Sequence, residues 1–213
     1  PNKRVYFAQS GAAAVEAAIK GARLYQYNQM FKEGGLQKAD APGQYPYPYK
    51  IISRYKSWHG STSGASSVSG DPRRWFQEPL TVPGVVFAPE ANAFRPPFGT
   101  PENFVEENLG YIEYMIENEG GSNKVAAVIV EPVVGSNGII PPPPGYLKGV
   151  REICDRWGLL MIVDETMSGM GRTGKLLAIE HDGVEPDIII LGKALGAYCP
   201  LTAAIFSEKV SAS

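Results

Sequence analysis

Short apolar runs alternate with longer segments of helical spacing along this chain. Most of these runs are rich in Val, Ile, Leu and Ala. Most are also flanked by polar residues, glycine or proline. Uninterrupted apolar runs of this kind are typical of strands that are buried on both faces of a sheet. We expect strands at residues 5–7, 50–53, 85–88, 125–130, 159–163, 188–191 and 203–206.

Three of the intervening segments have the pattern of helices. Residues 12–30 are rich in alanine, whereas residues 104–118 and 146–157 carry apolar side chains at steps of three and four. These steps place the apolar side chains on one face of a helix.

Strands that alternate with helices predict the fold class. We expect an α/β fold, with a mostly parallel sheet and helices on both faces. In such a sheet the ligand binds outside the carboxyl ends of the strands. The residues that directly follow each strand are therefore the candidates for function.

Two segments differ from this alternation. Residues 34–49 (Gly34 to Tyr49) hold three prolines and three tyrosines, and we expect an irregular loop there. Residues 141–144 are four consecutive prolines, which adopt only an extended conformation and would lead the chain into the helix at residue 146.

Composition and charge exclude several classes of protein. The chain has 213 residues, 44% of them apolar and 20% charged, with a formal net charge of −2. This is enough chain for one sizeable core, without the basic field that would hold nucleic acid or an anionic membrane. No apolar run approaches the roughly 18 residues that cross a bilayer, and no signal peptide is recognisable. We therefore expect a cytoplasmic protein with neither a nucleic-acid nor a membrane partner.

Cysteines and histidines suggest neither a disulfide framework nor a metal site. The chain holds two cysteines, and Cys154 lies on the apolar stripe of residues 146–157, where we expect a small buried side chain. His59 and His181 are far apart in sequence and pair with no other ligand at helical spacing. We expect no bound metal.

The turns after the first two predicted strands contain candidate binding groups. Ser10 and Gly11 precede the first helix, and the N–H groups at a helix N-terminus bind phosphate, although an ordinary N-cap at Ser10 also explains the pattern. After the second strand come Trp58, His59 and Gly60. They are consistent with an aromatic stacking platform, or with a half-buried tryptophan beside a hydrogen-bonded histidine.

Acidic residues and a lysine follow three of the later strands. Glu131 follows one, and Asp164 and Glu165 follow another. Burial of unpaired carboxylates is costly, so these acids meet either a structural cation or a ligand. Lys193 follows residues 188–191 after the single residue Gly192, and Gly196 comes three residues later. A lysine in a desolvated site is a good nucleophile, and the alternative is a lysine that extends into solvent.

The combination of these groups carries more information than any one of them. A phosphate-binding turn, an aromatic platform, an acid and a lysine are the groups that pyridoxal 5'-phosphate requires. The turn anchors the phosphate, the aromatic side chain covers one ring face, the acid keeps the pyridine nitrogen protonated, and the lysine holds the aldehyde as a Schiff base.

On these motifs the chain resembles the class III, ω-amino-acid type aminotransferases of fold type I, over nearly its whole length. Residues 162–174 (IVDETMSGMGRTG) are similar to the family's acid followed by a Gly-Phe-Gly-Arg-Thr-Gly turn. Residues 186–193 (PDIIILGK) resemble the strand that ends at the family's Schiff-base lysine. Residues 10–18 (SGAAAVEAA) and 130–132 (VEP) are further matches.

The resemblance implies a role for each matching residue. Lys193 would hold the cofactor and move the proton between the substrate Cα and the C4′ carbon of the cofactor. Asp164 would pair with the pyridinium nitrogen. The remaining cofactor-binding residues would be Gly11 and Ala12 at the phosphate, Trp58 and Thr166 on the two ring faces, and Glu131 on the substrate side.

The same resemblance implies an incomplete fold. Family members run to about twice this length, so residues 1–213 would be a partial pyridoxal-phosphate-binding large domain that lacks an N-terminal segment and the C-terminal small domain. The family also implies a homodimer, an amine donor and a 2-oxo acid acceptor. Residues 34–49 are a candidate to contact the partner subunit. Ala12 stands where the family commonly has Thr or Ser, so one hydroxyl contact to phosphate is missing.

Two other functions remain open from the sequence. A nucleotide-binding α/β protein fits the Ser10–Gly11 turn, but no GxGxxG motif directly follows a predicted strand, and there is no P-loop lysine. A truncated cofactor-binding domain without catalytic turnover would retain the same site residues. Residues 71–75 (DPRRW) place two further cations in a loop, where solvation by water is the simpler interpretation.

Overall fold

A computed structural model describes residues 3–32 and 46–213 of the chain, so most of the loop predicted at residues 34–49 lies outside the described residues. All seven predicted strands are present, with ends that differ from the prediction by no more than one residue. The strands are β1 (Arg4–Ala8), β2 (Lys50–Arg54), β3 (Val85–Ala88), β4 (Val125–Val130), β5 (Leu160–Asp164), β6 (Ile188–Leu191) and β7 (Thr202–Phe206).

The strands form one sheet in the order β1-β7-β6-β5-β4-β2-β3. The five strands from β6 to β3 in this order are parallel to one another. β7 is antiparallel to both β6 and β1, so β1 runs in the same direction as the five parallel strands. The mostly parallel sheet is therefore confirmed, and β1 delivers its carboxyl end to the same edge as the others.

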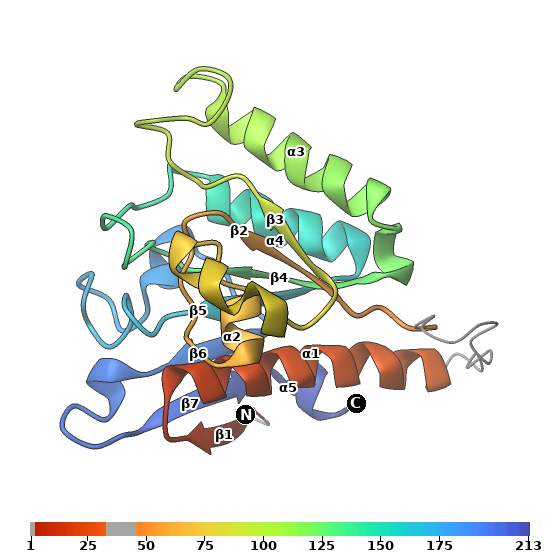
Figure 1. The fold of residues 1–213 in the computed structure, drawn as a ribbon, viewed down its shortest axis with the longest axis vertical. Helices are drawn as coiled ribbons and strands as arrows, with labels where there is room; N and C mark the ends of the chain where they lie inside the picture. Colours follow the sequence, from red (N-terminus) through yellow and green to blue (C-terminus); the bar gives the residue numbers. More distant parts are fainter. Residues whose placement is uncertain (1–2, 33–45) are drawn as a thin grey trace.

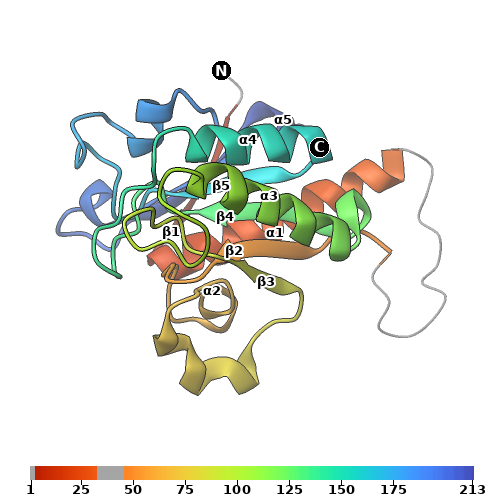
Figure 2. The same cartoon turned by 90° about the horizontal axis from the view of Figure 1, so that it is seen from above.

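Helices cover both faces of the sheet, as predicted (Figures 1 and 2). Helix α1 (Gly11–Lys32) packs on one face through the fully buried Ala14, Ala18 and Ala22, whose spacing of four places them on one stripe. Helices α3 (Phe104–Asn118) and α4 (Tyr146–Trp157) pack on the other face. No helix in the described ranges combines the length and the apolar character needed to cross a membrane.

The core lies on either side of the central strands. Every residue of β4 is buried, and its side chains alternate between the two faces. Val128 belongs to the cluster under α3 and α4, whereas Ile129 belongs to the cluster under α1. Cys154 of α4 is fully buried as predicted, and burial raises the pKa of its thiol to about 12.

The pattern analysis does not predict the shorter helical pieces. α2 (Ser63–Ser67) and the 3₁₀ segment Pro72–Leu80 follow β2 and lie beside the β3 edge of the sheet (Figure 2), and α5 (Glu208–Ser211) follows β7. Three of the five residues of α2 are serine, which leaves no apolar period to detect there, and Pro79 inside the 3₁₀ segment argues against a helix. Their conformation depends on contacts with the rest of the fold.

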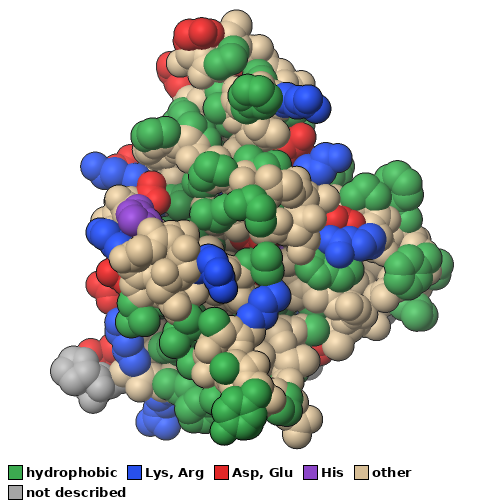
Figure 3. All heavy atoms as spheres, turned by 90° about the vertical axis from the view of Figure 1, so that its left-hand side faces the viewer, with side chains coloured by type: hydrophobic (Ala, Val, Ile, Leu, Met, Phe, Trp, Pro, Cys, Tyr) green, Lys and Arg blue, Asp and Glu red, His purple; other side chains and the backbone are tan. Residues whose placement is uncertain are grey.

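The loops that follow β4, β5 and β6 gather on the left of Figure 1. This is the carboxyl edge of the sheet, where a ligand site was predicted. Viewed from outside, this face carries basic, acidic and apolar side chains that are interspersed (Figure 3).

Candidate functional site

A cavity of about 200 Å³ opens at the carboxyl edge of the sheet. Each predicted site residue lines it, although these residues come from five separate segments of the chain. Three residues without a predicted role, His59, Gly60 and Met167, also line it. The predicted residues are Gly11, Ala12, Trp58, Glu131, Asp164, Thr166 and Lys193.

The N-terminus of α1 forms one wall. Ser10 acts as the helix cap, because its Oγ accepts a hydrogen bond of 3.2 Å from the N–H of Ala13. The cap therefore does not engage the N–H groups of Gly11 and Ala12, which belong to the first turn and lack an acceptor within the helix. The positive end of a 22-residue helix faces the cavity at this point.

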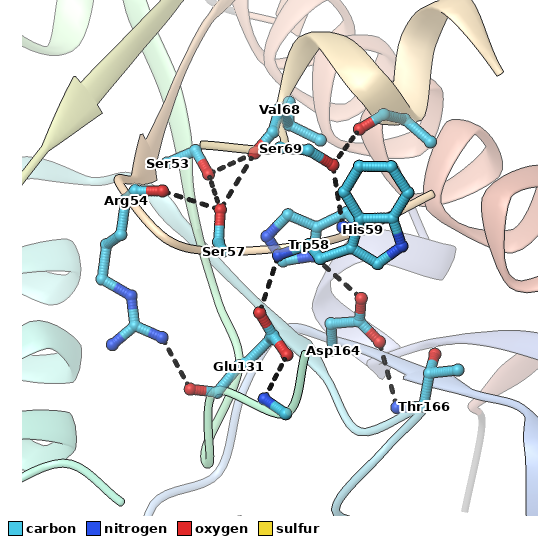
Figure 4. Close-up of polar contacts among 12 residues, drawn as sticks. Ser53, Arg54, Ser57, Trp58, His59, Val68, Ser69, Glu131, Asp164 and Thr166 are labelled. Atoms are coloured by element: carbon cyan, nitrogen blue, oxygen red, sulfur yellow. Dashed lines mark hydrogen bonds and ion pairs between the residues drawn. The ribbon is translucent and has the colours of Figure 1, made fainter. Parts of the chain in front are cut away.

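A buried histidine–aspartate pair lies across the cavity (Figure 4). Asp164 is the last residue of β5, and its Oδ2 lies 2.8 Å from the Nδ1 of His59. Its Oδ1 accepts a hydrogen bond of 3.0 Å from the N–H of Thr166. Burial alone raises the pKa of Asp164, but the hydrogen bond and charge of His59 and the N–H of Thr166 outweigh it and hold this pKa below its usual value. The carboxylate is therefore kept ionised.

Glu131 follows β4 and fixes the backbone around the cavity. Its Oε1 accepts from the N–H of Trp58 at 2.9 Å, and its Oε2 accepts from the N–H of Gly135 at 3.0 Å. Burial raises the pKa of Glu131, the charge of Asp164 adds to this, and His59 opposes it. The side chain thus links the loop after β2 to the loop after β4 (Figure 4).

The Trp58 loop reaches the cavity through a close backbone contact. Gly60 has a φ of +138°, and a Cβ at this position would lie 2.6 Å from the Cβ of Ala12. Only glycine allows the loop to pack against the first turn of α1 in this way. Trp58 is half-buried, and His59 is buried and hydrogen-bonded to Asp164. The prediction of a half-buried tryptophan beside a hydrogen-bonded histidine is therefore confirmed.

Lys193 lies at the mouth of the cavity in a strained turn. It is exposed, and its φ of +43° is unusual for a residue with a side chain. The preceding Gly192 permits a close approach to the floor of the site, because a Cβ there would lie 3.0 Å from the Cγ2 of Thr166. The hydroxyl Oγ1 of Thr166 is buried without a hydrogen-bond partner in the described structure.

A second cavity of about 460 Å³ adjoins the first. The two cavities share Thr166, Met167 and Lys193. Its other walls are mostly apolar, including Val133 and Ile139, and Arg172 also lines it. This space adjoins Lys193, outside the part of the site that Asp164 and the N-terminus of α1 line.

Glu165 points away from the site. Its Oε1 accepts a hydrogen bond of 2.8 Å from the N–H of Ile179, and its Oε2 accepts one of 2.5 Å from the hydroxyl of Ser168. These contacts shape the turn that follows β5. The two adjacent acids therefore face opposite sides, as the extended backbone predicts.

Sequence reasoning did not identify His59 as the partner of Asp164. The two residues lie 105 positions apart and belong to different loops. A histidine directly after the candidate aromatic residue, in a loop that follows a strand, was the available signal.

The chemistry of these groups fits pyridoxal phosphate. The α1 N-terminus suits a phosphate, and Trp58 and Thr166, which line the same cavity, could pack against a flat ring. Asp164 is an ionised acceptor for a protonated ring nitrogen, and Lys193 supplies an amine. In the described part of the chain no Lys or Arg forms an ion pair with Asp164 or Glu131. The negative charge of these carboxylates is therefore available to balance a cationic ring.

Comparison with known proteins places the chain in one family. The family model for class III aminotransferases matches residues 1–213. A taurine–pyruvate aminotransferase from Bilophila wadsworthia is 35% identical over 97% of this chain, and a leucine/methionine racemase from Thermococcus litoralis is 36% identical over 95%. The chain spans 42% and 41% of the length of these two relatives.

Solved structures agree with this assignment. The crystal structure of a taurine:2-oxoglutarate aminotransferase from Bifidobacterium kashiwanohense, in complex with pyridoxal phosphate and glutamate, superposes with a TM-score of 0.83 at 36% sequence identity. The match covers 98% of this chain and 43% of that protein. The fold, the residues around the cavity and the family match together show that the chain belongs to the class III aminotransferases, which are pyridoxal-phosphate-dependent enzymes.

Proposed function

We propose that this chain is the cofactor-binding part of an enzyme that transfers an amino group from an amine or ω-amino acid to a 2-oxo acid. Pyruvate and 2-oxoglutarate are the proposed acceptors. The observation that carries the proposal is the shared cavity: an ionised, buried Asp164 and an exposed Lys193 line the same space as the N-terminus of α1. When bound, pyridoxal phosphate supplies an aldehyde that takes up the amino group and a ring that stores the electrons of a broken C–H bond.

Lys193 and Asp164 are the proposed catalytic residues. The Nζ of Lys193 would hold the cofactor and then move the proton to and from the substrate Cα. Asp164 would keep the ring nitrogen protonated, because an ionised carboxylate favours a cation at hydrogen-bond distance. His59 supports this role by keeping Asp164 ionised and fixing its orientation.

The remaining residues would bind and orient. The N–H groups of Gly11 and Ala12 would hold the phosphate. Trp58 and Thr166 would pack against opposite faces of the ring, and Glu131 would keep the Trp58 loop in place through its hydrogen bond to the backbone. A bound cofactor would exclude water from this space and so strengthen each electrostatic contact.

The adjoining cavity of about 460 Å³ is the proposed space for the substrate. Its apolar walls suit the methylene or aromatic part of an amine, and Arg172 would attract an acidic group at the far end of the donor. Taurine, the donor named for two of the similar proteins, carries such an acidic group, and we propose ω-amino acids of this kind as the first donors to test.

The proposed assembly follows the family. Residues 1–213 would be a partial large domain, and the full-length enzyme would be a homodimer with its cofactor near the interface. The edge strand β1 exposes Val5, Tyr6 and Phe7, which is consistent with apolar surface that further protein covers. Sedimentation of the full-length enzyme tests this proposal, and a monomer with full activity would contradict it.

Borohydride reduction followed by peptide mapping tests the central proposal. We expect the protein to absorb in the visible region with pyridoxal phosphate and to retain the cofactor on Lys193 after reduction. Lys193→Ala should lose this attachment and all amino transfer. Lys175→Ala is the matched control, because Lys175 is a surface lysine bonded to the Glu180 carbonyl. Attachment at another lysine would overturn the proposal.

A second candidate is racemisation, which the 36% identity with the leucine/methionine racemase favours. Racemisation needs no 2-oxo acid, so an assay of one amino acid enantiomer without an acceptor separates the two reactions. Cofactor attachment with neither reaction, in the full-length protein, would instead support a cofactor-binding domain without turnover.

A further inference from the structure

Arg73 lies directly over the ring of Trp58. The guanidinium carbon is 4.0 Å from the ring centroid, which is close for a cation–π contact. Trp58 lines the candidate cofactor cavity, so the group that holds its ring also sets one wall of that cavity. Arg73 lies at the start of the 3₁₀ segment Pro72–Leu80, which the proposed function does not use.

Asp71 fixes the guanidinium in two places. Its Oδ1 accepts from the Nε of Arg73 at 2.8 Å, and its Oδ2 accepts from the Nη2 at 2.9 Å. The N–H of Arg73 also donates to Oδ1 at 2.7 Å. This fork-to-carboxylate geometry fixes the guanidinium plane more firmly than a single contact does.

Asn137 ties this pair to the Trp58 loop. Its Nδ2 donates to the Oδ2 of Asp71 at 2.5 Å and to the carbonyl of Lys56 at 2.6 Å. The backbone continues the link, because the N–H of Asp71 donates to the carbonyl of Ser57 at 3.0 Å. The segment that carries Arg73 is thus bonded to the two residues that precede Trp58.

A close backbone contact makes this arrangement possible. Gly70 pairs with Tyr55, and a Cβ on Gly70 would lie 2.1 Å from the carbonyl oxygen of Arg54. The main chain of Trp58 is held separately, through its N–H bond to Glu131. The ring and the backbone of Trp58 therefore have different anchors.

We propose that Arg73 is a positioning residue that holds the Trp58 ring as a preorganised wall of the cofactor site, with Asp71 and Asn137 fixing Arg73 in turn. This inference rests on the proposed function for the identity of the ligand. A ring that is fixed before binding loses little freedom when the cofactor stacks on it. The two anchors of Trp58 then contribute to cofactor affinity without contact with the cofactor.

The structure offers a matched control one residue away. Arg74 lies 4.6 Å over the ring of Phe87 and forms an ion pair with Glu78, so it makes the same kinds of contact outside the cofactor cavity. Arg73→Met and Arg74→Met therefore each remove one cation–π contact and one ion pair, in two different places. Arg73→Lys keeps the charge without the fork, and Asp71→Asn weakens the fork without changing Arg73.

The first measurement is tryptophan fluorescence without cofactor, with Trp58→Phe subtracted to isolate Trp58. Arg73→Met should shift the Trp58 emission to longer wavelength and make it easier to quench with acrylamide, and Arg74→Met should change neither. Asp71→Asn should act like a weaker Arg73→Met. This measurement needs no cofactor, so it tests the anchoring of Trp58 even if the protein has another function.

The second measurement is a titration with pyridoxal phosphate. Arg73→Met should weaken binding by about tenfold, Arg73→Lys should recover only part of this, and Arg74→Met should bind as the wild type does. Unchanged Trp58 fluorescence in Arg73→Met would overturn the inference. Wild-type affinity for pyridoxal phosphate in Arg73→Met would mean that Arg73 has no role in binding. Tighter binding would mean that Arg73 covers the face of Trp58 on which the cofactor ring stacks, and either result would also overturn the inference. If the wild type binds no cofactor, the proposed function fails, and the affinity claim fails with it.

Discussion

Buried carboxylates lie at opposite edges of the same sheet, and their negative charges are balanced in different ways. At the amino edge, Asp187 accepts from Arg151 at 2.7 Å and from the N–H of Met161 at 2.8 Å, and Lys209 lies 3.5 Å away. The positive charges of this cluster come from the protein itself. The negative charge of Asp187 is thus balanced by cations of the folded chain.

At the carboxyl edge the buried carboxylates have fewer cationic partners from the described part of the chain. Two carboxylates, Asp164 and Glu131, line the cavity, and His59 forms the one ion pair that either of them makes in the described part of the chain. The ring Nε2 of His59 and the hydroxyl of Thr166 are buried without partners there. Buried acids alone therefore do not mark a site. Buried acids without their own cations do, because a ligand can supply what the protein does not.

The largest expected effect comes from Asp164→Asn. The amide keeps the shape and can still accept from His59, but the negative charge is lost. We expect amino transfer to fall by about 10²–10³-fold while cofactor attachment at Lys193 persists, because electrostatic stabilisation of this kind has that magnitude. Steady-state kinetics with borohydride mapping measure both. Near-normal turnover would show that the two edges of the sheet do not differ in the way argued above.

Asp187→Asn should give the opposite result. Arg151 would be left with a weakened partner in a largely buried position, and the free energy of unfolding should fall by about 3 kcal/mol. The rate of amino transfer in the folded protein should not change. Asp155→Asn is the matched control, because Asp155 pairs with the same arginine at 2.8 Å but is 65% exposed, and it should cost less than about 1 kcal/mol. Urea titrations of the three proteins decide between these expectations.

His59→Phe should have a smaller effect that depends on pH. Without His59, the effect of burial on Asp164 is opposed by Thr166 alone, so the pKa of Asp164 should rise. The carboxylate then protonates at higher pH, and the acidic limb of the rate profile should move toward neutrality, with about a tenfold loss of rate at its optimum.

His181→Phe is the control for this experiment, because His181 is exposed, its ring is hydrogen-bonded to Thr173, and it does not line the cavity. It should leave the profile unchanged. An acidic limb that stays in place in His59→Phe would mean that Asp164 is kept ionised by other groups.

Much of the fold could be predicted because the sheet is buried on both faces. Runs such as Val125–Val130 contain only apolar side chains, so both faces of such a strand must be buried. The limits of the apolar run along the chain are then nearly sufficient to locate the strand. α2 was missed for the converse reason. Ser66 and Ser67 are buried there, and the hydroxyl of Ser67 bonds back to the Ser63 carbonyl, a contact that is set by the surrounding fold and not by an apolar period.

The candidate site was predictable where chemistry is tied to strand ends. Asp164 ends β5 and Lys193 follows the adjacent parallel strand β6, so topology alone brings them to one edge. The contacts of His59 and Arg73 were not predictable in this way, because each depends on how two loops pack against one another. The DPRRW segment indicated a solvated loop, and Arg73 is indeed half-exposed, but its exposed side chain is held by Asp71 and rests on Trp58.

Asp71 offers the finest test, because it lies close to the cavity residue Trp58 yet has its own cation. The hydrogen bonds from Arg73 are the largest cause that lowers its pKa, to about 2 from an ordinary 3.8. A carboxyl with a lowered pKa stabilises the folded state above the unfolded pKa, and this contribution is lost as the pH falls through the folded pKa. The difference in unfolding free energy between wild type and Asp71→Asn should therefore be constant from pH 7 to about pH 5 and should disappear between about pH 4 and pH 2.

The size of this difference should be modest. Because the Arg73 side chain is 51% exposed, we expect a difference in unfolding free energy of about 1–2 kcal/mol, less than the full pKa shift of Asp71 implies. Glu78→Gln removes the acid from the neighbouring pair with Arg74, whose carboxylate is 49% exposed, and should show about 0.5 kcal/mol or less. If Asp71→Asn showed no such pH dependence, Asp71 would belong with the incompletely paired acids of the cavity, and the division between acids with and without their own cations would fail at this point.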